Sequence, residues 1–256
     1  MNRQSLFLRI SPIASLIIVL ALWELTVIVF NIPGYLLPKP STIFAAIVEY
    51  WPAILRESTY TLVTTMVGFG LAVVFGLALG LLVGYSATIY AGLYPLMVAF
   101  NAIPKVAVVP ILVLWFGIGA VPAALTAFLI SFFPIVVNVA TGLATIESEL
   151  EDVLKALGAS KLDIMRKVGI PRALPYFFGS LKIAITLAFV GSVLSESVAS
   201  NHGIGKFMMM AQAQFQVPLI FAGLFVLGFM GIAMYLVMAW IEKRMTGWAH
   251  RSGFSN

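Results

Sequence analysis

The sequence lacks cysteine altogether and contains only two histidines, His202 and His250, which are far apart in the chain. Without cysteine the chain cannot form disulfides, use a thiolate as a nucleophile or bind a metal through sulfur. Two distant histidines also argue against a histidine-rich di-metal enzyme in a membrane. The sequence therefore points away from redox and metal chemistry, and we expect no cofactor and no metal site.

Charged residues are also scarce: they make up 10% of the 256 residues, whereas 61% are hydrophobic. A soluble domain of this length does not need so much apolar surface, so the composition predicts a polytopic membrane protein in contact with lipid. The formal net charge is +5. Because the basic residues follow the topology rather than forming one patch, we do not expect nucleic-acid binding.

Long apolar segments divide the chain into predicted membrane-spanning helices, each about long enough to cross a bilayer core of roughly 30 Å. We expect six spans, at residues 12–30, 58–85, 91–116, 121–145, 176–197 and 218–240. The predicted fold class is therefore an all-α integral membrane protein, with one transmembrane domain at 12–245 between tails at 1–11 and 246–256. Between the first two spans, Ser41 is expected to cap a short amphipathic helix.

Small and polar residues inside these spans indicate how the helices pack. Gly76, Gly80 and Gly84 recur at every fourth position, a pattern that lets a second helix approach closely. We expect this packing within one subunit, and a dimer interface is the alternative. Glu24 in the first span is expected to make a buried polar contact.

The third span is unusual, because three prolines interrupt it and a lysine lies near its middle. Such breaks are tolerated in membranes where the freed backbone groups face protein or water, and an ionisable residue at this depth suggests a function. Pro104 and Lys105 are therefore candidate residues of a translocation pathway, together with Glu196 near the outer end of the fifth span. The alternative for Lys105 is a structural role, by snorkelling or pairing. Lys182, near the cytoplasmic start of the fifth span, is expected to snorkel.

The most polar stretch, Leu150–Pro175, lies between the fourth and fifth spans and carries five basic and three acidic residues. Apolar residues at helical spacing predict a first short helix, which Gly158 ends as a C′ glycine. Ser160 and Asp163 have the spacing of a capping box for a second short helix, and Pro171 is expected to end that helix. The residue chemistry leaves two interpretations open: a loop that lies on the membrane surface, or a docking element for a soluble partner.

The spacing within this charged loop resembles the EAA loop of permeases from binding-protein-dependent ABC importers. In that family Glu-Ala-Ala is followed after three residues by Gly, and after nine more by Ile-x-Leu-Pro. The matching positions here, with changes that keep charge or apolarity, are Asp152-Val153-Leu154, Gly158 and Val168-Gly169-Ile170-Pro171. A second stretch, from Ile103 to Gly119, resembles the nitrate, sulfonate and taurine branch of these permeases. The resemblance covers about residues 58–245.

The resemblance implies a type I ABC importer permease that works as a homodimer with two ATPase subunits and an extracytoplasmic substrate-binding protein. It implies that the loop at 146–173 forms coupling helices that sit in a groove of the ATPase. The ATPase-coupling residues are then Asp152, Val153, Leu154, Lys155, Ala156, Leu157, Gly158, Ala159, Ser160, Val168, Ile170 and Pro171. The branch suggests a small anion such as nitrate, a sulfonate or taurine, and the alternative substrate is an aromatic or pyrimidine-type compound.

The chain has no G-x-x-x-x-G-K-[ST] motif, so we expect no enzyme activity of its own, with ATP hydrolysis in a separate subunit. Two other functions remain open. A self-sufficient channel or secondary transporter would use Lys105 and Glu196 as an ion path, but no obvious inverted repeat supports it. A membrane enzyme would need a cluster of His, Asp or Glu at the interface, and the sequence offers none.

The distribution of basic residues predicts the orientation. Ten basic residues lie on the side of the tails and the charged loop: Arg3, Arg9, Lys155, Lys161, Arg166, Lys167, Arg172, Lys243, Arg244 and Arg251. Three basic residues lie on the opposite side: Lys39, Arg56 and Lys206. By the positive-inside rule, both termini and the loop are expected on the cytoplasmic side of a bacterial inner membrane.

Overall fold

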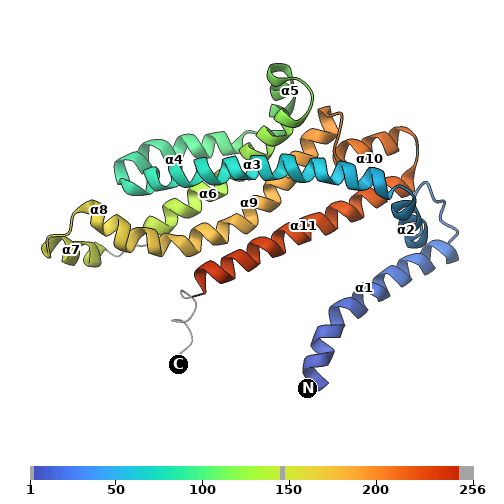
Figure 1. The fold of residues 1–256 in the computed structure, drawn as a ribbon, viewed down its shortest axis with the longest axis horizontal. Helices are drawn as coiled ribbons and strands as arrows, with labels where there is room; N and C mark the ends of the chain where they lie inside the picture. The colour runs from blue at the N-terminus through green and yellow to red at the C-terminus, as the bar shows by residue number, and fades with distance from the viewer. Residues whose placement is uncertain (1–2, 145–147, 248–256) are drawn as a thin grey trace.

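The computed structural model describes residues 3–144 and 148–247, and all regular secondary structure in this part of the chain is helical. The long helices are α1 (Arg3–Val29), α3 (Trp51–Tyr85), α6 (Ala120–Ala144), α9 (Ile170–Ala199) and α11 (Val217–Thr246). The shorter ones are α2 (Pro40–Glu49), α4 (Ala87–Ala102), α5 (Lys105–Phe116), α7 (Ser148–Ala156), α8 (Lys161–Ile164) and α10 (Ile204–Ala213), with a π-helical turn, η1 (Met165–Gly169), before α9. Figure 1 shows an elongated bundle with α7 and α8 at one end and α2 and α10 at the other.

The all-α fold is confirmed, and most of the predicted spans have a matching helix. Four helical stretches are long and apolar enough to cross a membrane: α3, α6, α11 and the continuous stretch Lys161–Ala199 that includes α9. The third predicted span is instead a pair of helices, α4 and α5, bent by 87° at a break, and it counts as a fifth span only if the pair is taken together. In α1 the apolar section Ala14–Val29 is shorter than a full span. Residues 146 and 147 of the predicted loop, and 248–256 of the predicted tail, lie outside the described residues.

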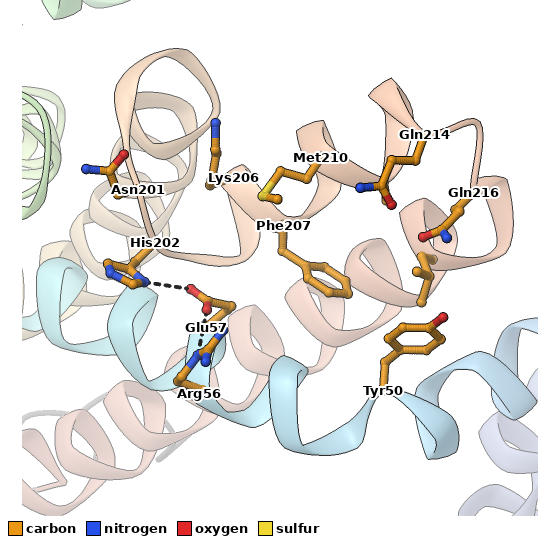
Figure 2. Close-up of a pocket in the computed structure, with 12 residues that line it drawn as sticks. Tyr50, Arg56, Glu57, Asn201, His202, Lys206, Phe207, Met210, Gln214 and Gln216 are labelled. Atoms are coloured by element: carbon orange, nitrogen blue, oxygen red, sulfur yellow. Dashed lines mark hydrogen bonds and ion pairs between the residues drawn. The ribbon is translucent and has the colours of Figure 1, made fainter.

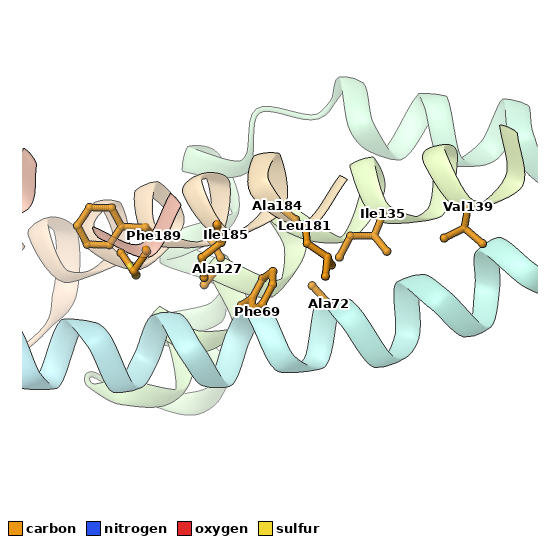
Figure 3. Packing of buried hydrophobic residues seen from close by; sticks show 11 residues of the cluster. Phe69, Ala72, Ala127, Ile135, Val139, Leu181, Ala184, Ile185 and Phe189 are labelled. Atoms are coloured by element: carbon orange, nitrogen blue, oxygen red, sulfur yellow. The ribbon is translucent and has the colours of Figure 1, made fainter. Parts of the chain in front are cut away.

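The centre of the bundle is α6, which lies between α3 and α9 and packs against both. Figure 3 shows the buried side chains where the three helices meet, including Phe69 and Ala72 from α3, Ala127 and Ile135 from α6, and Ile185 from α9. Helix α11 packs against α9 and adds Met234 to this core, while α1 leads away from the bundle toward its N-terminal end (Figure 1). The three central helices therefore form the packed core of the molecule.

Glycines in α3 bring α6 close. A Cβ atom added at Gly76 would lie 2.9 Å from the Cβ of Ile135, and one at Gly80 would lie 2.7 Å from the Cβ of Val139. Gly84 continues the same face against α6. Because these distances are too short for carbon atoms, any larger residue would push the helices apart. The partner helix belongs to the same chain, so the predicted packing within one subunit is confirmed.

An ion pair joins α9 to α11. Nζ of Lys182 lies 2.5 Å from Oε2 of Glu242, and both side chains are mostly buried, with 26% and 19% exposed. The expectation that Lys182 snorkels is therefore wrong. A charge inside a helix bundle is less costly when it has a partner of opposite sign, and the neighbouring helix supplies one.

The charged loop runs directly into the fifth span, so the expected end of the helix at Pro171 is also wrong. Ile170 is helical, with φ −61° and ψ −49°, and Pro171 lies in the first turn of α9. Proline has no N–H and its ring needs room in the preceding turn. The π-helical turn at Met165–Gly169 is wider than an α-helical turn and lies immediately before the proline. The helix can therefore continue from Lys161 to Ala199.

Ser41 does not cap α2 as expected. The helix begins at Pro40, and Lys39 before it makes no side-chain cap. Instead, the half-buried carboxylate of Glu24 in α1 accepts hydrogen bonds from the Ser41 backbone N–H (3.0 Å) and hydroxyl (2.7 Å). The polar contact expected of Glu24 thus exists, although it is not fully buried. It satisfies a free donor in the first turn of α2 from a neighbouring helix.

Candidate functional site

The charged loop forms two short helices joined by a tight turn at one end of the bundle (Figure 1). Gly158 in the turn has φ +86°, a conformation that glycine adopts without strain. Its N–H donates to the carbonyl of Lys155 (2.9 Å), and the N–H of Ala159 donates to the carbonyl of Leu154 (3.0 Å). These two bonds make a Schellman motif, so the predicted C′ position of Gly158 is confirmed.

Ser160 begins the second helix of the loop. Its hydroxyl accepts a hydrogen bond from the Asp163 N–H (3.1 Å), and the Asp163 carboxylate accepts one from the Ser160 N–H (3.3 Å). The predicted capping box is therefore confirmed. In this loop, outside the predicted spans, the Ser160 hydroxyl and then its N–H hold the pKa of Asp163 below the usual value. A carboxylate in the first turn of α8 also complements the helix dipole.

The second helix of the loop is attached to the bundle, yet the loop presents an apolar face. Ile164 is buried against the bundle, and the ammonium of Lys161 lies 4.3 Å from the centre of the Tyr85 ring at the end of α3. Three large apolar side chains nevertheless point outward, with the following fractions exposed: Val153 56%, Leu157 78% and Leu162 50%. An apolar patch flanked by charged residues is typical of a surface that another molecule covers.

The structure divides the predicted ATPase-coupling residues between two elements. Asp152 to Ser160 lie on α7 and in the turn that follows it, whereas Val168, Ile170 and Pro171 lie on the helix that leads from η1 into α9. The second group is therefore part of the same continuous helix as the fifth span. A displacement of the loop would act on that helix directly.

Lys105 lies at the bend between α4 and α5. Its ammonium donates hydrogen bonds to the carbonyl oxygens of Phe100 (3.2 Å) and Asn101, and to Oδ1 of Asn101 (3.1 Å). These carbonyls belong to the end of α4, so the positive charge complements the negative end of that helix. Within the described residues no hydrogen bond or ion pair joins Lys105 to Glu196. In this conformation Lys105 has a structural role, and a pathway role stays a prediction.

A buried polar cluster at the opposite end of the bundle was not predicted. The carboxylate of Glu196 in α9 is fully buried and accepts a hydrogen bond from the Thr61 hydroxyl of α3 (2.8 Å). The hydroxyls of Thr64 and Ser192 lie 3.3 Å from its other oxygen and 2.6 Å from each other. Each of these polar side chains therefore has a partner away from lipid, as buried polar groups require.

This cluster also holds the start of α10. The N–H groups of the N-cap residue Gly203 and of the first two residues of α10 donate to side chains of α3 and α9: Gly203 to Glu57 (2.7 Å), Ile204 to Thr61 (2.9 Å) and Gly205 to Glu196 (3.2 Å). We call Glu57, Thr61 and Glu196 the α10 clamp. Two carboxylates at a helix N-terminus satisfy its free donors and complement its dipole. A side chain at Gly203, where φ is +102°, would collide with the Glu196 carboxylate.

A pocket of about 330 Å³ lies beside the α10 clamp. Figure 2 shows Arg56 and Glu57 of α3 on one side and Lys206 and Phe207 of α10 on the other. Glu57 is its one acidic residue; Nε of Arg56 lies 2.9 Å from Glu57, whose side chain is 9% exposed. The lining residues are Tyr50, Arg56, Glu57, Asn201, His202, Lys206, Phe207, Met210, Ala211, Gln214, Gln216 and Leu219. In the described part of the chain, no group of three or more His, Cys, Asp or Glu is placed to hold a metal ion.

The charged loop, the central bundle and the chain's length agree with a known family. Residues 72–247 match the family described as "Binding-protein-dependent transport system inner membrane component". The chain belongs to this family. It is therefore a multi-pass permease of the inner membrane, from a family of transport components rather than enzymes.

Individual relatives agree with this assignment. The permease is 32% identical to "Probable ABC transporter permease protein" of Haemophilus influenzae, over 92% of this chain and 96% of that one. It is 31% identical to the formylaminopyrimidine transport permease protein ThiX of Halalkalibacterium halodurans, over 93% and 96%. It is 25% identical to the taurine transport system permease protein TauC of Escherichia coli, over 92% and 88%. These relatives confirm the ABC permease assignment and include the taurine branch.

A solved structure has the same fold. It is titled "Inward facing conformations of the MetNI methionine ABC transporter", and it superposes with a TM-score of 0.67 at 21% identity, covering 77% of this chain and 97% of that chain. The type I permease fold is thereby confirmed.

Proposed function

We propose that two copies of this permease form the translocation pathway of an ATP-driven importer, and that each copy docks onto a separate ATPase subunit through its charged loop. The observation that carries the proposal is the form of this loop. It is a capped pair of short helices at the end of the bundle, the second of which continues into α9, with Leu157 78% exposed at its turn. The family supports the setting, because its description names a component of a binding-protein-dependent transport system.

The continuous helix from Lys161 to Ala199 provides a path for coupling. It begins in the charged loop, passes through the central core and ends beside the α10 clamp. Movement of the loop by an ATPase would act directly on this helix, and the π-helical turn at Met165–Gly169 provides a natural hinge between its loop end and its core segment. The bundle would then alternate between two states whose populations the ATPase sets.

Replacing Leu157 with glutamate tests the docking. The side chain is mostly exposed, so the fold should tolerate the change, but a carboxylate buried in an apolar interface is costly. We expect Leu157→Glu to weaken retention of the ATPase encoded beside the permease by about tenfold or more, which corresponds to about 1.4 kcal/mol. Co-purification from membranes measures this.

Phe215→Glu is the matched control, because Phe215 is 87% exposed at the other end of the molecule, and it should retain the ATPase fully. Equal retention by Leu157→Glu and the unaltered permease would contradict the docking. Full transport by the permease purified without any ATPase would instead favour a self-sufficient transporter.

For the substrate, we favour an aromatic or pyrimidine-type compound over a small anion such as nitrate, a sulfonate or taurine. The relative named for formylaminopyrimidine is 31% identical, whereas the one named for taurine is 25% identical. In addition, the ammonium of Lys105, which an anion pathway would use, is bonded to the end of α4. The pathway role of Pro104, Lys105 and Glu196 remains a prediction. Calorimetry on the binding protein encoded beside the permease decides: binding of taurine but not of formylaminopyrimidine would reverse the preference.

The positive-inside distribution supports an orientation with both termini and the charged loop in the cytoplasm. The pocket beside the α10 clamp then lies on the extracytoplasmic side, because α10 is at the opposite end of the bundle from α7 and α8 (Figure 1). The extracytoplasmic binding protein would approach this end.

A further inference from the structure

Lys206 at the pocket beside the α10 clamp has no partner within the described residues. Its side chain is half-buried on the first turn of α10, and it makes no hydrogen bond or ion pair there. A cation placed near the N-terminus of a helix is also unfavourable, since that end is positive. Among the described residues, therefore, no acidic group pairs directly with the Lys206 ammonium, and its charge is available to a partner.

Arg56 adds a second available cation to the same pocket. Only its Nε contacts Glu57, and its side chain is 74% exposed, so its two terminal nitrogen atoms extend beyond the ion pair. Glu57 carries one negative charge against the two positive charges of Arg56 and Lys206, and its carboxylate already contacts Arg56, the Gly203 N–H and, at 3.6 Å, Nδ1 of His202. The rim consequently carries positive charge in excess of its one acid.

We propose that this pocket receives an acidic side chain of the extracytoplasmic binding protein, with Lys206 and Arg56 as the groups that pair with it. The inference rests on the proposed function, which supplies the binding protein as a partner. Complementary charge across an interface steers two proteins into one orientation and raises the rate of association.

The shape of the pocket favours a protein side chain over the transported solute. Its lining includes the apolar side chains of Phe207, Met210 and Leu219, and its volume of about 330 Å³ suits one or two side chains. The lining residues come from the start of α3 and the residue before it, from α10 and the segments that flank it, and from the first turn of α11, and none comes from α4, α5 or α6. The pocket is therefore separate from the bend at Pro104 and Lys105.

The α10 clamp links a protein docked at this pocket to the long helices α3 and α9. Glu57 lines the pocket and also binds the start of α10, while Glu196 holds the same helix end from α9. A displacement of α10 would therefore be transmitted to α3 and α9 through three hydrogen bonds. The docked protein would therefore act on one end of the helix Lys161–Ala199, and the charged loop forms the other end of the same helix.

Zero-length cross-linking tests the pairing directly. A carbodiimide joins an amine to a carboxylate only where the two are in contact, so treatment of the permease–ATPase–binding protein complex should link Lys206 to an Asp or Glu of the binding protein. Mass spectrometry identifies the linked peptides. Lys206→Arg keeps the charge but removes the reactive amine, so it should retain binding and lose this cross-link.

Charge reversal provides the second measurement. Lys206→Glu should weaken binding of the binding protein, in lipid nanodiscs at low salt, by about tenfold or more, and added salt should shrink the difference. Lys39→Glu is the matched control: it makes the same change of charge at the same end of the molecule, but outside this pocket. It should bind as the unaltered permease does.

The outcomes separate the two proposals. If the binding protein stimulates ATP hydrolysis by the unaltered complex, but Lys206 forms no cross-link and Lys206→Glu binds normally, this inference is wrong and the proposed function stands. If the binding protein neither binds nor stimulates the unaltered complex, both are wrong. If Lys206→Glu changes the affinity for free solute while leaving the binding protein's affinity unchanged, the pocket belongs to the solute and this inference is overturned.

Discussion

Single small residues on one face of α3 set the distance between α3 and α6. Gly68, Ala72, Gly76 and Gly80 follow one another at every fourth position, and Ala72 is completely buried. Between helices in lipid there is little hydrophobic driving force, so close packing of this kind holds them together. Gly70 lies on the same helix but on another face, where an added Cβ would meet no atom within 4 Å.

We expect Gly80→Leu to destabilise the permease, because its side chain would collide with Val139 of α6. Overpacking of this kind typically costs about 1–3 kcal/mol. Gly70→Leu is the matched control: its side chain enters open space, and leucine is a better helix former than glycine, so stability should stay the same or rise. Thermal unfolding in one detergent compares the two, and equal midpoints would show that the stripe does not hold these helices together.

Residues whose partners lie close in sequence were predictable, and the others were not. Gly158, Ser160 and Asp163 make their bonds within six positions of one another, so local spacing was enough. Lys182 pairs with Glu242 on another helix, a partner that no local pattern identifies. Snorkelling was the reasonable expectation only because α11 could not be placed beside α9 from the sequence.

Among the elements, α10 depends on its neighbours more than on its own sequence. It has ten residues and no side-chain cap of its own, and its first donors are satisfied from α3 and α9. A helix this short is marginal in isolation. The α10 clamp therefore stabilises the position of α10, which forms one wall of the pocket.

We expect Glu196→Leu to release the start of α10. Leucine is of similar size but accepts no hydrogen bond, so the buried Gly205 N–H and Thr61 hydroxyl would lose an acceptor, at about 1–3 kcal/mol. Hydrogen exchange of the segment 203–207 should accelerate about tenfold or more. Glu196→Gln should stay close to the unaltered protein, because its amide oxygen still accepts and its amino group can donate to Thr64 or Ser192. Unchanged protection in Glu196→Leu would mean that other contacts hold α10.

The sequence predicted which elements exist better than it predicted their ends. The apolar spans and the two loop helices follow from composition and spacing. The start of α3 at Trp51 rather than residue 58, the 87° bend before α5 and the passage of the helix through Pro171 depend on contacts in three dimensions. The α10 clamp did leave a signal: Glu57, Thr61 and Thr64 share one face of α3 by helical spacing, which indicates a polar partner inside the bundle.

At the scale of the whole molecule, the two ends of the long axis carry different features. The charged loop forms one end, the α10 clamp and its pocket form the other, and one helix of 39 residues connects them. Signals from an ATPase and from a binding protein would therefore meet on α9. The ATPase and the binding protein can reach the two ends only if these ends lie on opposite sides of the membrane. The distribution of basic residues predicts this orientation.

The orientation can be measured directly, because the chain has no cysteine and any introduced thiol is unique. Ala156 and Ala213 are matched positions: each is the exposed last residue of a short helix, α7 at one end and α10 at the other. In intact spheroplasts, a membrane-impermeant maleimide should label Ala213→Cys and leave Ala156→Cys unlabelled. In detergent, after the ATPase has been removed, both should react, which controls for accessibility of the thiol. Ala156→Cys has a neutral small side chain before and after the change, so topology should be unaffected. Labelling of Ala156→Cys alone in intact spheroplasts would place the charged loop outside the cell, where no ATPase could reach it, and would overturn the docking proposal together with the role inferred for Lys206.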